Sequence, residues 1–113
     1  MSFPGWVEPQ DWEEVQEVAR IHPWALFYLS LPSCGVCTAL KPKVDSIARD
    51  HQIPVFYVDL EKIPLAGGQW NVFTIPGVLL YVQGRESWRG LRFLDLRDLE
   101  DQIDRLQGIL FSR

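Results

Sequence analysis

Two apolar segments on either side of a helical one constrain what this chain can fold into. Residues 24–29 and 53–59 are apolar, aromatic-rich runs, as expected of central strands that are buried on both faces. Between them, Ser33 is expected to cap a helix, and Pro42 falls inside it, where it should produce a kink. The apolar positions of this helix recur at helical spacing, at Cys37, Leu40, Val44 and Ile47. The order strand, helix, strand predicts a right-handed βαβ unit.

The remaining segments predict a helix before this unit, and a short helix, a hairpin and a final helix after it. Residues 8–21 read as an amphipathic helix with Asp11 and Glu14 as a capping box, and residues 2–7 as either an edge strand or a tail. Pro64 and two glycines make residues 61–72 a short, irregular helix. The remaining predicted elements are a strand over 77–82, a turn at 83–84, an antiparallel strand over 85–89 and a helix from a cap at Asp95 to Gly108. We expect residues 1–113 to form one domain.

The overall charge and the start of the chain limit the partners and the compartment that we expect. The 113 residues carry a net charge of −4 without a basic run, which argues against nucleic acid or an anionic membrane as partner. No basic segment followed by an apolar one opens the sequence, and no apolar run is long enough to span a bilayer. We therefore expect a cytoplasmic protein. A structural disulfide would not persist there.

The two cysteines of the chain, Cys34 and Cys37, are spaced so that their sulfurs lie one helical turn apart. Such a pair can form a short disulfide or hold one side of a metal ion. Cys34 lies at the expected helix start, where free amides and the helix dipole favour a thiolate, so it is the expected exposed nucleophile. Cys37, one turn inward, is the expected buried thiol. Zinc would need two further ligands, and His22 and His51 lack the spacing for it, so we expect no metal.

Several segments together resemble the thioredoxin family over roughly residues 10–108. The segments occur in the same order, and with the same sequence spacing, as in that family. They are Phe27–Leu29, Cys34-Gly35-Val36-Cys37 with Pro42, Val58–Glu61, and Phe73–Tyr81 with Gly84. The resemblance implies an α/β thioredoxin-like fold, with a central mixed sheet of four or five strands flanked by helices on both faces. It also implies a cis proline at Pro76, opposite the disulfide. Carried over by position, Cys34 is the nucleophile and Cys37 the resolving cysteine, and the substrate groove is lined by Gly35, Val36, Ile75, Pro76 and Gly90.

Three groups of positions depart from the family's pattern. Ser33 and Val36 stand where thioredoxins usually have tryptophan and proline, which leaves the direction of exchange open. Tyr28 replaces the family's buried aspartate and Tyr57 its lysine partner, so the resemblance implies that Cys37 loses its proton by another route, for which Asp59 is a candidate. Ser30 replaces a groove tryptophan, which implies a different choice of partners.

The function that we predict is a thiol–disulfide oxidoreductase. It would reduce or exchange disulfides in protein substrates through Cys34 and Cys37, as a monomer without a cofactor, and an unidentified reductase would restore the dithiol. Two alternatives stay open. One is a thioredoxin-fold binding module whose cysteines are redox-inactive or redox-sensing. The other is a glutaredoxin-like enzyme that uses a low-molecular-weight thiol.

Overall fold

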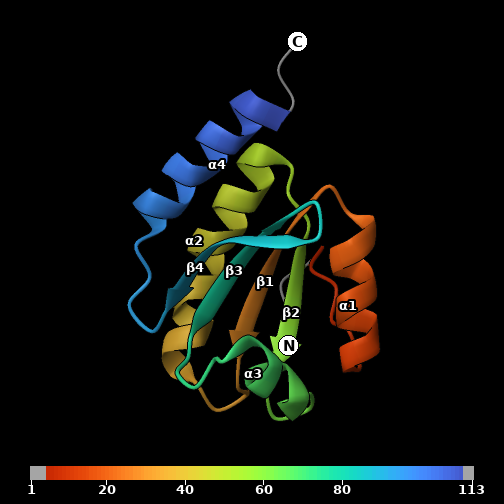
Figure 1. The fold of residues 1–113 in the computed structure, drawn as a ribbon. Helices are drawn as coiled ribbons and strands as arrows, with labels where there is room; N and C mark the ends of the chain where they lie inside the picture. Colours follow the sequence, from red (N-terminus) through yellow and green to blue (C-terminus); the bar gives the residue numbers. More distant parts are fainter. Residues whose placement is uncertain (1–4, 111–113) are drawn as a thin grey trace.

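A four-stranded mixed sheet forms the centre of the molecule (Figure 1). The computed structural model describes residues 5–110. The strands are β1 (Trp24–Ser30), β2 (Val55–Asp59), β3 (Gly77–Val82) and β4 (Arg85–Leu91), and their order across the sheet is β2-β1-β3-β4. β2 is parallel to β1, while β3 is antiparallel to both β1 and β4. The parallel pair, connected through a helix, confirms the predicted βαβ unit.

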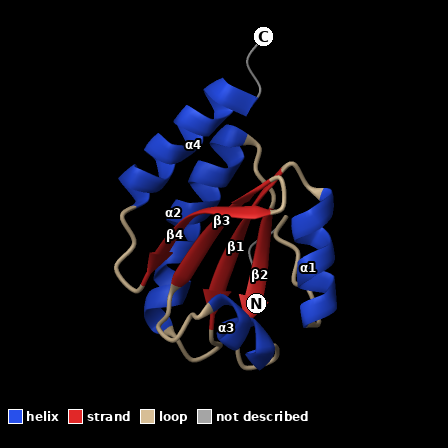
Figure 2. Cartoon of the chain, in the orientation of Figure 1, coloured by secondary structure: helices blue, strands red, loops and turns tan. Residues whose placement is uncertain are grey.

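Four helices cover the two faces of this sheet (Figure 2). They are α1 (Trp12–Ile21), α2 (Gly35–His51), α3 (Pro64–Trp70) and α4 (Leu96–Leu110). In Figure 2, α2 and α4 lie on one side of the sheet, and α1 and α3 lie on the other. This arrangement confirms the predicted α/β, thioredoxin-like architecture with helices on both faces.

Alternate residues of the central strands feed two separate apolar clusters. Leu26 and Tyr28 of β1 point into the cluster beneath α2 and α4, while Phe27 and Leu29 point into the cluster beneath α1 and α3. Successive side chains of a strand face opposite sides, so a strand covered on both faces must be apolar throughout. All seven residues of β1 are buried, which explains the uninterrupted apolar run in the sequence.

The first helix begins later than the sequence predicts. Asp11 is its N-cap and accepts a hydrogen bond from the Glu14 amide at 2.8 Å, so α1 starts at Trp12 rather than at residue 8. The Glu14 carboxylate accepts from the Gln10 amide instead of the Asp11 amide that a capping box would use. Of the segment 2–7, Val7 makes a single parallel bridge to Phe56 on the edge of the sheet, and residues 2–4 lie outside the described part.

Two predicted helix boundaries are wrong. Ser33 does not cap α2, because Cys34 takes the extended N-cap conformation and its sulfur accepts a hydrogen bond from the Cys37 amide. Gly108 does not end α4, which continues to Leu110, where the leucine side chain packs against the cluster beneath α2 and α4. Asp95 caps the start of α4 as predicted, since its carboxylate accepts from the Asp98 amide at 3.0 Å.

The hairpin after β3 forms as predicted, with a longer second strand. Gln83 and Gly84 both have positive φ, the backbone that a two-residue hairpin turn requires. β4 extends to Leu91, and its register shifts between Leu80 and Tyr81, which leaves Ser87 as an extra residue in β4. Within residues 5–110, none of the helices combines the length and the apolar character needed to cross a lipid bilayer.

Candidate active site

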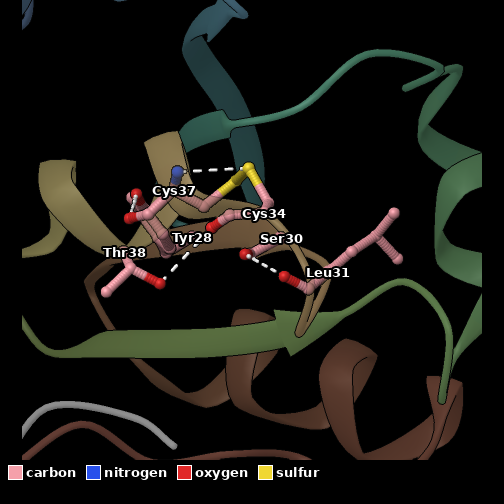
Figure 3. The surroundings of a disulfide bond; sticks show 6 residues. All are labelled: Tyr28, Ser30, Leu31, Cys34, Cys37 and Thr38. Carbon is pink, nitrogen blue, oxygen red and sulfur yellow. Dashed lines mark hydrogen bonds between the residues drawn. A yellow bond between two sulfur atoms is a disulfide. The ribbon is translucent and has the colours of Figure 1, made fainter.

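The loop that follows β1 places Cys34 at the N-cap of α2. The Cys34 amide donates to the carbonyl of Leu31 at 3.1 Å, which closes the turn before the helix. A disulfide joins Cys34 to Cys37, whose Cα atoms are 5.3 Å apart (Figure 3). The Cys37 amide donates to the Cys34 sulfur at 3.1 Å. This amide would hold a Cys34 thiolate in the same way, and the positive end of the helix dipole adds to its stabilisation.

The two sulfurs differ in their access to solvent. Cys34 is half-buried, whereas Cys37 is 0% exposed and belongs to the cluster beneath α2 and α4. Only Cys34 can therefore be reached by a large disulfide substrate. The arrangement matches the exposed and buried thiols predicted from the helix position.

The loop before β3 supplies the other side of the site. The Ile75–Pro76 peptide bond is cis, as the resemblance implied. Ile75 and Cys34 are both half-buried and pack against the same apolar cluster, which also contains Cys37. Val36, between the cysteines, is 65% exposed, and the space beside Gly35 is open. Gly35 and Val36 thus lie between the two bonded cysteines, and Ile75 packs against the cluster that contains Cys37; Pro76 is buried.

Gly90 does not lie beside Pro76. It pairs with Val78 within the sheet, and a side chain added there would collide with Trp88 and Leu94. The residue next to the cis proline is Arg92, whose amide donates to the Pro76 carbonyl at 2.7 Å. Arg92 has a φ of 67°, a conformation that favours glycine. Sequence reasoning placed Gly90 in the groove and missed Arg92, because a residue other than glycine with positive φ leaves no signal in the sequence.

Tyr28 lies directly behind Cys37. It is fully buried, and its hydroxyl donates a hydrogen bond to the carbonyl of Cys37. Its ring stacks on Tyr57 with centroids 6.3 Å apart. Burial, and to a lesser degree the neighbouring Tyr57, raises the pKa of Tyr28 above its ordinary value. Tyr28 therefore keeps its proton and does not take one from Cys37.

Asp59 and Ser30 have local roles at the carboxyl ends of β2 and β1. One Asp59 oxygen accepts from the Glu61 amide at 2.8 Å and from the Lys62 amide at 3.2 Å, which shapes the turn towards α3. Ser30 is buried, and its hydroxyl donates to the Leu31 carbonyl at 3.2 Å. Ser30 therefore presents no side chain to a partner.

The two histidines pack against neighbouring side chains. The ring of His22 packs at a tilt of 60° against that of Phe56, with ring centroids 5.2 Å apart. His51 lies 3.5 Å from a carboxylate oxygen of Glu100 on α4, and its side chain is mostly buried. Within residues 5–110, no three side chains of the metal-binding kinds gather in one place.

Comparisons with known proteins agree with this geometry. The thioredoxin family model matches residues 7–105. The chain is 27% identical over 93 residues to the thioredoxin-like protein YdfQ of Bacillus subtilis, which covers 81% of this chain and 83% of YdfQ. It is 24% identical over 101 residues to the chloroplastic M-type thioredoxin of Spinacia oleracea, covering 88% of this chain and 55% of the spinach protein. The solved structure of a mutant thioredoxin from Halobacterium salinarum shares the fold, with a TM-score of 0.80 at 21% identity over 93% of each chain.

The sheet, the helix-capping cysteine and the buried second sulfur define a redox protein of the thioredoxin kind. The chain belongs to the thioredoxin family. It is a thiol–disulfide oxidoreductase, and its redox-active disulfide joins Cys34 to Cys37.

Proposed function

We propose that this oxidoreductase reduces or exchanges disulfides in other proteins, with Cys34 as nucleophile and Cys37 as resolving cysteine. One observation carries the proposal. A half-buried cysteine at the start of α2 is bonded to a cysteine that solvent does not reach, and Ile75 packs against the cluster that contains the buried one.

The two exchange steps balance without a further reactant. The Cys34 thiolate attacks one sulfur of the substrate disulfide, so a mixed disulfide forms and the other substrate sulfur leaves as a thiolate that takes up a proton. Cys37 loses its proton and attacks the Cys34 sulfur. The Cys34–Cys37 disulfide forms, and the second substrate thiol is released. The substrate gains two electrons, and the protein loses two.

The proposed substrate surface surrounds the Cys34 sulfur. Gly35, Val36, Ile75 and Pro76 would contact the substrate chain, and Arg92 takes the place expected of Gly90. An open approach at Gly35 and the exposed side chain of Val36 support this surface, because a substrate chain has to come within bonding distance of Cys34.

The setting of the reaction belongs to the same proposal. Residues 1–113 would act as one monomeric domain in the cytoplasm, and a separate reductase would reduce the disulfide after each turnover. The family match over residues 7–105 supports a single domain. The net charge of −4 supports protein partners rather than nucleic acid or an anionic membrane.

Replacing each cysteine in turn tests the assigned roles. Cys34→Ser should abolish the reduction of a protein disulfide such as that of insulin, with dithiothreitol as electron source. Cys37→Ser should still attack once and accumulate as a mixed disulfide, visible by mass spectrometry. Cys34→Ser with full reductase activity would overturn the proposal. Partner binding that survives both replacements, together with no turnover in the native protein, would favour a binding module.

A further inference from the structure

The release step requires a charge in a place that disfavours charges. Cys37 attacks only as a thiolate, yet its side chain is fully buried in an apolar cluster. Burial without a compensating charge disfavours the thiolate relative to the thiol. The environment of Cys37 must therefore contain something that favours its negative form.

Lys41 lies one helical turn after Cys37 on α2. Side chains four residues apart on a helix are neighbours, with Cβ atoms about 5–6 Å apart. Lys41 is only 6% exposed, and its ammonium nitrogen lies 4.5 Å from the centre of the Tyr57 ring. That ring stacks on Tyr28, whose hydroxyl bonds to the Cys37 carbonyl. Lys41 is thus held on the side of α2 that faces the sheet, as Cys37 is.

Within residues 5–110, the side chains that pack with Cys37 in the apolar cluster carry no positive charge. From β1 and β2 come Tyr28 and Tyr57, and from β3 and α4 come apolar side chains: Val78, Leu80, Leu99 and Ile103. Asp45, one turn further along α2, accepts from Trp6 at 2.9 Å and from Arg49 at 2.7 Å. Glu8 acts on Lys41 from the segment before α1. Among the buried residues of the described chain, Lys41 is the only one that carries a positive charge.

We propose that Lys41 is a positioning residue whose buried positive charge stabilises the Cys37 thiolate and so speeds the release of the substrate. This inference rests on the function proposed above. It says what favours the second exchange step, in which Cys37 attacks the mixed disulfide. No further reactant is needed. The proton of Cys37 passes to solvent before Cys37 attacks the mixed disulfide, and the ammonium of Lys41 stabilises the thiolate that remains.

The energetics of Lys41 itself support this role. Burial lowers the pKa of Lys41, and the negative charge of Glu8 acts in the opposite direction. Burial thus disfavours the ammonium, and a neighbouring thiolate favours it, so each of the two charges favours the other.

The experiment compares Lys41→Met with Lys41→Arg, which keeps the positive charge, and with Lys43→Met, which removes an exposed lysine of the same helix. The first readout is the rate at which a preformed mixed disulfide on Cys34 releases its substrate, followed from acid to alkaline pH. Lys41→Met should slow release about tenfold at neutral pH and move the pH profile upward by about one unit, since one unit corresponds to tenfold in thiolate fraction. Lys41→Arg and Lys43→Met should retain the native profile.

The second readout isolates the resolving thiol. In the Cys34→Ser protein, the NMR shift of the Cys37 Cβ reports the pH at which half of this thiol is ionised. Adding Lys41→Met should raise that pH, and adding Lys43→Met should not. A lost packing contact alone would not move this titration. Should Lys41→Met not fold, Lys41→Gln, which is also neutral, takes its place in both measurements.

The outcomes separate this inference from the proposed function. Unchanged release and an unchanged Cys37 titration in the Lys41→Met protein would overturn the role of Lys41. The proposed function would stand if the mixed disulfide at Cys34 still formed. Failure of that first step in the native protein would instead overturn the proposed function.

Discussion

Tyr28 connects the active-site helix to the sheet at a single point. Its hydroxyl donates to the carbonyl of Cys37, while its ring is buried between β1 and α2. The bond holds the first turn of α2 against β1, so the disulfide keeps a fixed position relative to the Ile75–Pro76 loop on the neighbouring strand. A tyrosine can hold the helix in this way because its neutral hydroxyl is satisfied by one hydrogen bond. A charged side chain buried in the same apolar cluster would need a partner to offset its charge.

Replacing Tyr28 with phenylalanine should lower the free energy of unfolding by about 1 kcal/mol, because one buried hydrogen bond is lost while the ring remains. The effect should depend on pH. Burial raises the pKa of Tyr28 above the ordinary value of 10.0, so above pH 10 the unfolded chain releases this proton while the folded protein retains it. Native stability should thus fall as pH rises through 10, and Tyr28→Phe should lack this part of the fall. Urea unfolding over alkaline pH measures both effects, and identical slopes in the two proteins would contradict the assignment.

Arg92 combines an unusual backbone with a place beside Pro76. Its φ is 67°, and its guanidinium lies over the exposed Phe93 ring at 5.3 Å. A residue with a Cβ is disfavoured by about 1 kcal/mol in the left-handed region, so Arg92→Gly should be more stable than Arg92→Ala by about that amount. Arg105, which is exposed within α4, provides the control. There the order should reverse, and Arg105→Gly should be less stable than Arg105→Ala, since glycine weakens a helix. Urea unfolding of the four variants tests this, and equal stability of the two Arg92 variants would refute it.

At the scale of elements, α4 is held to α2 by a narrow apolar face. Leu99 and Ile103 are fully buried, and Leu96 and Leu106 pack at the margin of the same cluster. The cluster beneath α2 and α4 also contains Cys37. Packing of α4 therefore contributes to the apolar environment of Cys37.

Leu99→Ala should destabilise the fold by about 3 kcal/mol, because a fully buried leucine leaves a cavity when it is truncated. Ile109→Ala on the same helix should change stability by less than about 0.5 kcal/mol, since Ile109 is 69% exposed. Thermal and urea unfolding of both variants make the comparison. Similar losses for the two would show that α4 is not anchored by its inner face.

Periodicity alone predicted most of the elements. The strands were found because residues that feed two clusters must be apolar throughout, and α4 because Leu96, Leu99, Ile103 and Leu106 recur every three or four residues. The N-cap of α2, Cys34, was not predicted, because sulfur is a weak hydrogen-bond acceptor and serine is a more common capping residue than cysteine. Lys41 was missed although its spacing from Cys37 and Val44 placed it on the apolar face, because a lysine in a helix is normally read as exposed. Arg92 was missed because a non-glycine residue with positive φ leaves no local signal.

At the scale of the whole molecule, the disulfide links the redox state to the stability of the fold. It closes a loop with a sequence separation of only 3, at the end of a helix whose other turns are packed on the sheet. The chain-entropy argument gives such a short loop about 2 kcal/mol of stabilisation. The oxidised protein should therefore unfold at a higher urea concentration than the reduced one.

Urea unfolding with and without dithiothreitol measures this difference, and Cys34→Ser, which cannot form the bond, should show none. The sign also reports the direction of exchange. A disulfide that stabilises the fold is harder to reduce, which suits a reductant. A reduced form as stable as the oxidised one, or more so, would contradict the prediction and would indicate an oxidant.

The two edges of the sheet affect how readily strands of other chains could pair with it. On the β2 edge, Val7 donates to the Val55 carbonyl at 3.2 Å and accepts from the Tyr57 amide at 2.9 Å, so part of this edge is already paired. The β4 edge is interrupted by the extra residue Ser87 and carries the ion pair between Arg89 and Glu86. Flat, unpaired edges recruit strands from other chains and start aggregation. Because neither edge is both flat and unpaired, strands of partly unfolded chains that carry disulfides should not pair with this sheet when such chains bind near it.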